Sequence, residues 1–367
     1  MKTISVEILR AWLEEGRPVT VLDVRPTAEW TEWAIPGSIH VDAYDALKTH
    51  DPAALANVDI PSDVPVVTVC AAGKTSLVAA EQLAARGLQA LSLDGGMKAW
   101  SLAWNIAEVP VYTSGVRIIQ VRRTGKGCLS YLIGAGEEAM VIDASLDPQV
   151  YLDLARSHGW QITSVFDTHI HADHLSRSRR LAHMSGAMLF LPDQQRVSFP
   201  FTAMRDGDTL ATSHLMLIAL RTPGHTPEST CYLLNNALLF TGDTLFPTGI
   251  GRPDLHADEQ ETRARSSLLY HSLHKLLALP SETLVLPGHT NQPVPFDGKP
   301  IGATLAEIDE QVGILHATQM MFVEALLRLL PPTPPNYERI VSLNEAGMVP
   351  EGDITELEAG ANRCAIS

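Results

Sequence analysis

The sequence has little basic charge, few cysteines and no long apolar run, and each shortage disfavours a class of protein. Its 27 Lys and Arg residues are outnumbered by 42 Asp and Glu residues, which gives a formal net charge of −15. This excess of acid disfavours nucleic acids and anionic membranes as partners, because both attract basic patches. No apolar run approaches the roughly 20 residues of a membrane-spanning helix, and residues 1–18 lack the apolar core of a signal peptide.

Only four cysteines are present, and none lies close to another in sequence: Cys70, Cys128, Cys231 and Cys364. This spacing disfavours a disulfide framework and a cysteine-rich structural zinc site. We therefore expect a reducing, cytoplasmic location, where a single cysteine can remain a free thiol. Cys128 and Cys231 lie in apolar strand patterns and are interpreted as core residues.

The chain of 367 residues is longer than one hydrophobic core usually grows, so two domains are expected. In residues 1–105, short apolar runs alternate with helical patterns, which predicts a small α/β domain with a parallel sheet. Its expected strands are 19–24, 65–70 and 89–95. Residues 105–115 are interpreted as a linker.

Residues 112–367 form the second expected domain. Strand-rich segments precede and follow a cluster of histidines, and a helical pattern covers 268–279. This order predicts two packed sheets flanked by helices, an αββα sandwich. A long helix is expected at about 304–330, ended by the prolines of 331–335.

A lone cysteine, Cys70, lies where an expected buried strand runs into a helix, in the sequence C-A-A-G-K-T-S. Backbone N–H groups of such a turn and the following helix N-terminus would stabilise a thiolate or an anionic persulfide. Gly73 permits the tight loop. A buried structural cysteine is the alternative interpretation.

Three stretches of this region, LDVRPTAEW with IPGSIHV, the loop that begins at Cys70, and DGGMKAW, resemble the rhodanese family of sulfurtransferases. The resemblance implies that Cys70 accepts sulfur as a persulfide and that Asp23 and Arg25 support the fold. It also implies that the loop residues cradle the sulfur: Ala71, Ala72, Gly73, Lys74, Thr75 and Ser76. Thr75 stands where the family often has arginine, which leaves open an inactive module that only docks partners.

The densest group of metal-ligand side chains is D-T-H-I-H-A-D-H-L-S at 167–176, which carries His169, His171, Asp173 and His174. Further candidates follow later expected strands, each directly after a glycine: His225, Asp243 and His289. Such a set, at ordered loop positions, predicts a metal centre. It resembles the metallo-β-lactamase fold, whose binuclear members would use all seven residues to hold two Zn²⁺.

More local stretches, at 242–254, 268–280 and 358–367, resemble the persulfide dioxygenases of that fold. The resemblance implies one Fe²⁺ per chain, held by His169, His225 and Asp243 as a facial triad. His171, Asp173, His174 and His289 would then lie around the ligands. Arg252 either acts on a ligand or the substrate or forms a loop-stabilising salt bridge, and Cys364 either adjoins the site or is a buried structural thiol.

Together these patterns predict a persulfide dioxygenase in sulfide detoxification. It would oxidise a low-molecular-weight thiol persulfide, such as glutathione persulfide, with O₂ to sulfite, coupled to rhodanese sulfur transfer with sulfite or thiosulfate. The alternative is a binuclear zinc hydrolase of glyoxalase II type, which cleaves a thioester. The sequence leaves a homo-oligomer open.

Overall fold

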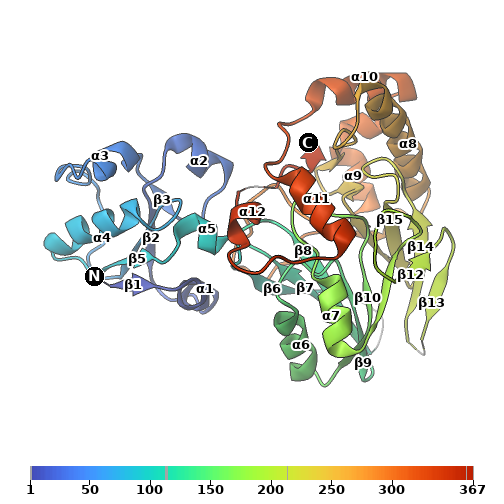
Figure 1. Cartoon of the computed structure of the whole chain (residues 1–367), viewed down its shortest axis with the longest axis horizontal. Helices are drawn as coiled ribbons and strands as arrows, with labels where there is room; N and C mark the ends of the chain where they lie inside the picture. The colour runs from blue at the N-terminus through green and yellow to red at the C-terminus, as the bar shows by residue number, and fades with distance from the viewer. Residues whose placement is uncertain (1, 112–114, 213, 361, 367) are drawn as a thin grey trace.

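The computed structural model describes residues 2–111, 115–212, 214–360 and 362–366. A smaller N-terminal domain lies beside a larger C-terminal one, and the short helix α12 (Thr355–Glu358), near the end of the chain, lies close to α5 (Gly96–Trp100) of the smaller domain (Figure 1). None of the helices in the described part of the chain is both long and apolar enough to cross a membrane.

The N-terminal domain is an α/β unit, as predicted. Among the described residues its strands form a five-stranded parallel sheet in the order β1-β5-β4-β2-β3. The strands are β1 (Thr3–Ile4), β2 (Thr20–Asp23), β3 (Ile39–His40), β4 (Val66–Val69) and β5 (Ala90–Leu93). The helices are α1 (Val6–Glu14), α2 (Thr27–Glu32), α3 (Tyr44–Lys48), α4 (Thr75–Ala85) and α5. Apolar side chains of β2 and β4 are buried on both faces of this sheet, as in other parallel sheets covered by helices.

The C-terminal domain contains two facing sheets, as the αββα prediction requires. The first, traced over the described residues, has the order β12-β11-β10-β9-β8-β7-β6. Its strands are β6 (Asn105–Val109), β7 (Val116–Arg122), β8 (Leu129–Ala135), β9 (Glu138–Ile142), β10 (Gln161–Phe166), β11 (Met188–Pro192) and β12 (Thr202–Met204).

The second sheet has the order β13-β14-β15-β16-β19-β20 in the same described residues. Its strands are β13 (Thr209–Ala211), β14 (Met216–Arg221), β15 (Thr230–Leu234), β16 (Leu238–Gly242), β19 (Leu284–Pro287) and β20 (Ala303–Thr304). Side chains such as Tyr131, Phe166 and Phe240 fill the space between the two sheets. This shared core is the central layer of the sandwich.

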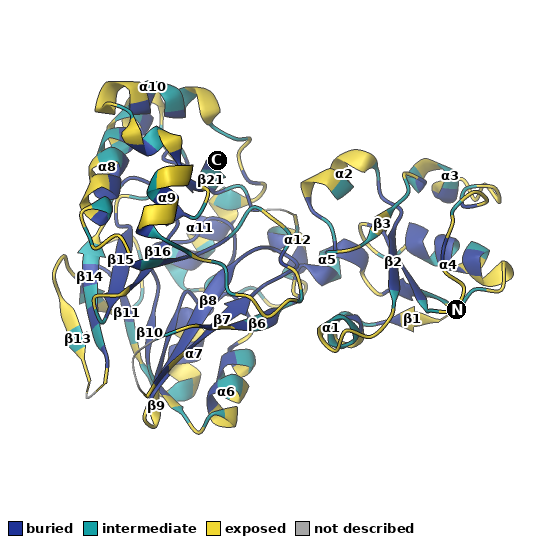
Figure 2. Ribbon diagram, turned by 180° about the vertical axis from the view of Figure 1, so that it is seen from behind, coloured by how far each residue is buried: buried dark blue, intermediate teal, exposed yellow. Residues whose placement is uncertain are grey.

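Helices cover the outer face of each sheet. Helices α6 (Pro148–Ser157) and α7 (Ser178–Ser185) pack on the first sheet, and α8 (Glu259–Leu277), α9 (Leu305–Gln311) and α10 (Gln319–Leu329) pack on the second. Their solvent sides are exposed whereas the strands of both sheets are largely buried (Figure 2). The amphipathic helices therefore supply the outer two layers.

Two expectations about the chain's organisation differ from the structure. Residues 105–109, expected in a linker, form β6, because their backbone pairs with β7 and their alternate side chains Asn105, Ala107 and Val109 are buried. The expected start of the second domain, residue 112, lies outside the described residues. The helix expected at 304–330 is interrupted, because the backbone of Val312 leaves the helical region and Thr318 caps a new helix.

The C-terminal segment also contains helices and a strand. Helix α11 (Tyr337–Ala346) is followed by α12 and by β21 (Ala365–Ile366), which pairs with β18 (Gly249–Gly251) beside β17 (Leu245–Phe246). The end of the chain is thereby held against the loop that follows β16, close to the predicted metal ligands.

Candidate functional sites

The Cys70 loop lies between β4 and α4. The Cys70 side chain is buried, with its Sγ 3.1 Å from the backbone N of Gly73 and 3.2 Å from Ser76 Oγ. Burial raises the pKa of this thiol, but the hydroxyl groups of Ser76 and Thr75 and backbone N–H groups of the loop outweigh burial and lower the pKa. The loop therefore stabilises a sulfur anion.

The DGGMKAW motif holds the Cys70 loop from the side. The backbone N–H of Met97 donates to the Cys70 carbonyl at 2.8 Å, and that of Lys98 donates to Ala71 at 3.0 Å. Gly96 has a φ of +57°, and a Cβ there would lie 2.2 Å from the Cys70 carbonyl oxygen. The motif's second glycine is thus required for the close approach of α5 to the loop.

The other residues of the loop predicted to bind the sulfur differ in solvent exposure. Ala71, Ala72 and Lys74 are exposed, Gly73 is half-buried, and Thr75 and Ser76 are buried. Ala71 and Ala72 line a cavity of about 440 Å³ that is also bordered by Glu356 and Gly360 of the C-terminal segment. The loop therefore opens towards the second domain.

Asp23 and Arg25 form a buried ion pair with N–O distances of 2.7–3.1 Å, and Arg25 also donates to the Trp33 carbonyl. These contacts tie β2 to the end of α2. They agree with the structural role predicted for the pair.

The seven predicted metal-ligand residues come together at one edge of the sandwich. His169, His171, Asp173 and His174 lie in the loop after β10, and His225, Asp243 and His289 follow β14, β16 and β19. Each of the seven is at most 4% exposed. Side chains from one loop and three strand ends therefore share one buried volume.

Within this group, His169, His225 and Asp243 form the arrangement most like a metal centre. Their ligand atoms all lie within 4.8 Å of one another. Asp243 Oδ2 is 3.7 Å from His169 Nε2 and 3.6 Å from His225 Nε2. These separations exceed hydrogen-bond length but are close to the roughly 3–3.6 Å expected between N and O atoms bound to one ion.

The opposite ring nitrogens of the two histidines make hydrogen bonds that fix their orientation. His169 Nδ1 lies 2.9 Å from Thr168 Oγ1, which donates to Asp143, and His225 Nδ1 donates to the Arg252 carbonyl at 2.7 Å. His289 Nδ1 donates to Asp243 Oδ1 at 2.8 Å. A metal-binding histidine needs such a partner on its second nitrogen.

Burial and charge favour the protonation states that bind metal. Burial lowers the pKa of His169 and His225, which keeps both imidazoles neutral, although Asp243 opposes this effect. Burial opposes ionisation of Asp243, but His289 and His169 outweigh it and lower the pKa of this carboxyl. His169 Nε2 and Asp243 Oδ2 are buried without a hydrogen-bond partner among the described residues, as expected of atoms that serve as metal ligands.

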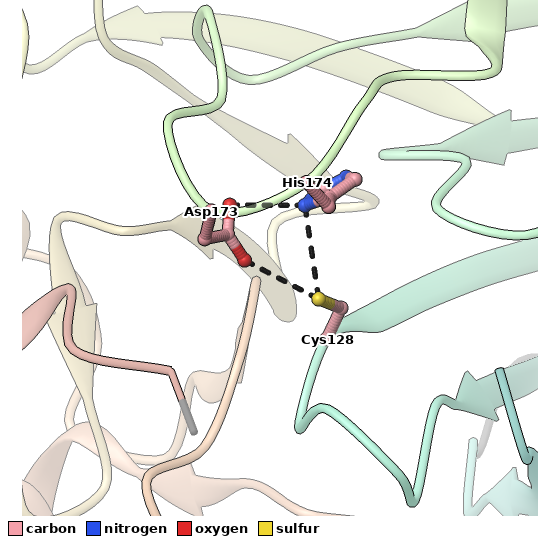
Figure 3. A group of neighbouring side chains, drawn as sticks. All are labelled: Cys128, Asp173 and His174. Atoms are coloured by element: carbon pink, nitrogen blue, oxygen red, sulfur yellow. Dashed lines mark hydrogen bonds and ion pairs between the residues drawn. The ribbon is translucent and has the colours of Figure 1, made fainter. Parts of the chain in front are cut away.

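Asp173 and His174 are arranged differently (Figure 3). Asp173 Oδ1 accepts from His174 Nδ1 at 2.9 Å, and Oδ2 accepts from the Cys128 thiol at 3.2 Å and from Asn362 Nδ2 at 2.6 Å. Both carboxylate oxygens of Asp173 are thus engaged by protein donors. Cys128, interpreted from the sequence as core alone, is buried but also contacts this carboxylate.

His171 faces two carboxylates that the sequence analysis did not select. Its Nε2 is 3.3 Å from Asp143 Oδ1 and 4.0 Å from Asp167 Oδ1. Burial lowers the pKa of His171, but Asp143, Asp167 and Asp173 together outweigh burial and raise the pKa to about 10. Asp143 and Asp167 also accept hydrogen bonds from Thr168, Ser176 and Ser178.

Arg252 is fully buried. It forms a two-pronged ion pair with Asp254 and donates to the carbonyls of Pro331, Pro332 and Arg363. These contacts use all five N–H groups of the guanidinium, which favours the loop-stabilising alternative over direct action on the substrate. Its backbone carbonyl nevertheless orients His225.

Cys364 is buried, and its carbonyl accepts from the Arg252 backbone N–H. Burial and the charges of Asp173 and Asp243 raise the pKa of this thiol well above its ordinary range. These shifts favour the protonated form of the Cys364 thiol. Cys231 is a core residue of β15, as interpreted.

Comparison with known proteins adds to this geometry. Residues 5–103 match the rhodanese-like domain, and residues 123–289 match the metallo-beta-lactamase superfamily. The solved structure of ETHE1 from Myxococcus xanthus is 30% identical, with a match that covers 66% of this chain and 99% of that one at a TM-score of 0.52. The chain belongs to the metallo-beta-lactamase superfamily. It carries a rhodanese-like domain in front of the metallo-beta-lactamase domain.

Other proteins similar to this chain are named as a metallo-beta-lactamase or as hydroxyacylglutathione hydrolases. A metallo-beta-lactamase from Staphylococcus aureus is 26% identical at a TM-score of 0.59, over 64% of this chain and 74% of that one. Hydroxyacylglutathione hydrolases from Rhizobium johnstonii and Pseudomonas entomophila are 35% and 34% identical, over 43% and 42% of this chain. The chain spans 56% and 58% of the length of these two curated relatives.

Proposed function

We propose that the chain is a persulfide dioxygenase with one iron per chain, coupled to a sulfurtransferase domain. The metallo-beta-lactamase domain would convert a low-molecular-weight thiol persulfide, O₂ and water into the free thiol, sulfite and two protons. His169, His225 and Asp243 would hold the iron. Iron held by these residues would supply electron transfer to O₂.

One contrast within the site carries the proposal of a single metal. Asp243 Oδ2 and His169 Nε2 are free of hydrogen bonds to described residues, whereas both oxygens of Asp173 accept hydrogen bonds at 2.6–3.2 Å. His289 belongs to none of the groups of three or more potential ligands found among the described residues, and Asp173 and His174 form such a group only with Cys128, whose thiol donates to Asp173. Two histidines and one carboxylate are the donor set of mononuclear non-haem iron enzymes.

The remaining residues would bind substrate and manage protons. A cavity of about 400 Å³ adjoins His225 and is lined by both basic and acidic side chains, Arg196, Arg265, Glu338 and Glu345, which suits a thiol that carries both an amine and carboxylates. Asp143 Oδ1, 3.3 Å from His171 Nε2, would favour a proton on that nitrogen. The ring centroids of His171 and His169 are 4.2 Å apart, so this proton would lie next to the triad. Burial of His171 and of the three triad residues limits water at the reacting sulfur.

The rhodanese-like domain would carry sulfur on Cys70. In one direction the Cys70 persulfide transfers its outer sulfur to sulfite, which releases thiosulfate and the Cys70 thiolate. In the other, the Cys70 persulfide transfers its outer sulfur to a low-molecular-weight thiolate, which forms the persulfide that is oxidised and releases the Cys70 thiolate. Hydrogen bonds from Gly73 and Ser76 to Cys70 Sγ support the thiolate leaving group.

A second candidate function is thioester hydrolysis. The 34–35% identity with proteins named hydroxyacylglutathione hydrolase favours it. That activity would use two zinc ions and His171, Asp173, His174 and His289 as further ligands. For Asp173 to bind a zinc ion, its carboxylate would have to give up hydrogen bonds that it accepts from Cys128, His174 and Asn362.

Metal content and substrate choice test the proposal together. We expect anaerobically purified protein to hold one iron per chain and to consume O₂ when glutathione persulfide is added. We expect no hydrolysis of S-lactoylglutathione. Two zinc ions per chain, thioester hydrolysis and no O₂ consumption would establish the hydrolase instead.

A further inference from the structure

The donors to Asp173 are held in place by distant parts of the chain. Cys128 directly precedes β8 and forms a β-bridge with His289. Asn362 comes from the C-terminal segment, where its Oδ1 accepts from the Cys364 backbone N–H at 3.0 Å. Pairing of β21 with β18 secures this segment. Both donors therefore reach Asp173 from ordered backbone.

The hydrogen bonds also fix the state of each group. A carboxylate only accepts, so His174 Nδ1 must carry the proton that it shares with Asp173. Cys128 Sγ lies 3.2 Å from Asp173 Oδ2, so Cys128 donates to the carboxylate as a thiol.

Two histidine nitrogens of the site would be available to a second metal ion. His174 Nε2 and His289 Nε2 are buried without a hydrogen-bond partner among the described residues. Two imidazoles alone make a weak metal site, and Asp173, His174 and His289 do not bring three ligand atoms within 4.8 Å of one another in the described residues. A carboxylate oxygen of Asp173 would have to leave its protein donors and turn towards the two imidazoles to complete a second site.

We propose that Cys128 and Asn362 are positioning residues that restrict the centre to one metal ion by occupying the carboxylate of Asp173. The inference rests on the proposed mononuclear centre and extends it, because it names the residues that exclude a second ion. Metal number in this chain is then set by hydrogen bonds to one carboxylate rather than by loss of ligand residues.

Metal stoichiometry tests the inference. Purified wild-type protein and the double variant Cys128→Ala/Asn362→Ala are equilibrated with excess Zn²⁺, desalted and analysed by elemental mass spectrometry. We expect one equivalent in the wild type and two in the double variant, a twofold rise. Damage to the fold lowers metal content, so a rise is not a general structural effect.

Two further variants sharpen the comparison. Cys128→Ser keeps a donor to Asp173 and, with Asn362 intact, should retain one equivalent. Cys231→Ala removes an equally buried thiol that contacts Thr222 and Thr241 instead of Asp173, and should also retain one. If the double variant does not fold, each single substitution is measured, and a content above one equivalent is expected for at least one.

The outcomes separate this inference from the proposed function. Two zinc ions in the wild-type protein would overturn the mononuclear centre itself. One equivalent in the wild type and in every folded variant that lacks a donor would overturn the role of Cys128 and Asn362 and leave the mononuclear proposal standing. Two equivalents in Cys231→Ala would also overturn the role assigned to these donors.

Discussion

At the scale of single residues, the Cys70 loop and the candidate metal centre differ in whether their key atoms accept hydrogen bonds. The Cys70 loop supplies donors to Sγ, whereas the triad leaves His169 Nε2 and Asp243 Oδ2 without partners among the described residues. An anion is stabilised by donors, but a metal ligand must keep its lone pair free. The same degree of burial therefore serves two different chemistries.

Removal of the Cys70 sulfur should separate the two activities. In Cys70→Ser we expect sulfur transfer from a persulfide to sulfite to fall to background, because a hydroxyl does not form a persulfide. O₂ consumption with added glutathione persulfide should remain close to that of the wild type. Thiosulfate production that persists in this variant would show that Cys70 is not the sulfur carrier.

The lowered pKa of Cys70 predicts the pH dependence of its reactivity. The thiolate is the reactive form, so alkylation of Cys70 by iodoacetamide should have a midpoint below that of an ordinary thiol. Ser76→Ala removes the most important stabilising donor and should shift this midpoint to higher pH. Cys231, with a pKa raised to about 11, is an internal control in the same mass-spectrometric experiment. An unchanged midpoint would contradict the role given to Ser76.

At the scale of elements, helix α11 secures the metal-binding loop. Asn344 Oδ1 accepts from the Ser176 backbone N–H at 2.8 Å, and its Nδ2 donates to the carbonyls of His171 and His174 at 2.8 and 2.9 Å. One side chain thus satisfies three backbone groups of the loop that presents His169. Such support orients ligands without touching the metal.

Loss of this support should weaken metal binding. We expect Asn344→Ala to lower metal affinity roughly 10- to 100-fold, the usual cost of removing a group that orients ligands. Competition with a chelator measures the change. Asn336→Ala is the matched control, because Asn336 directly precedes the same helix and donates to the carbonyls of Glu356 and Leu357 instead of to the metal-binding loop. Equal effects of both substitutions would show that only general helix stability is involved.

Local sequence patterns predicted those features that depend on near neighbours. The strand preceding Cys70, the strand preceding His169 and the glycines before His225, Asp243 and His289 are contiguous signals, and the structure brings all of these residues to the expected sheet edges. The interrupted helix at 304–330 is an exception, since the change of backbone direction at Val312 has only a weak local signature.

Residues that act through distant contacts were not recognised from the sequence. Asp143 is a single carboxylate after a strand, and Asn344 and Asn362 lie more than 165 positions beyond the loop groups that they contact. The choice between the two readings of Arg252 likewise depended on Pro331, Pro332 and Arg363, which approach it only in the folded chain. Sequence periodicity carries no signal for such pairings.

At the scale of the whole molecule, a buried ionic cluster joins the two domains and the chain end. Glu358 of α12 accepts from Arg123 at 2.7 Å, from Arg177 at 3.1 Å and from the Leu175 backbone N–H at 2.7 Å. Arg123 also donates to the carbonyl of Ser101, at the end of α5. The cluster links the rhodanese-like domain to the loop that carries His174.

Neutralisation of Glu358 should destabilise the protein markedly. Glu358→Gln leaves two buried arginines without their carboxylate, which we expect to cost about 3–5 kcal/mol of unfolding free energy at pH 7. Glu356→Gln, which removes an exposed partner of Lys98 on the same helix, should cost less than about 1 kcal/mol. Denaturant unfolding followed by tryptophan fluorescence compares the two, and similar losses would contradict the assigned role.

The same carboxyl predicts a pH dependence of stability. Burial opposes ionisation of Glu358, but Arg123 and Arg177 outweigh it and lower the pKa from 4.5 to about 2. Because the folded pKa is depressed, the contribution is present above about pH 4.5 and is lost as the pH falls towards 2, for a total of about 3 kcal/mol. The difference between wild type and Glu358→Gln should narrow over this window, and a constant difference would contradict the linkage.

The most direct test of the central claim is the ratio of O₂ consumed to sulfite formed by iron-loaded Cys70→Ser with glutathione persulfide. This variant lacks the sulfur carrier, so sulfite is not diverted to thiosulfate. The proposed dioxygenase predicts about one O₂ consumed per sulfite formed, and no O₂ consumption by the same variant loaded with zinc. Absence of O₂ consumption in the iron form, together with thioester hydrolysis in the zinc form, would contradict it.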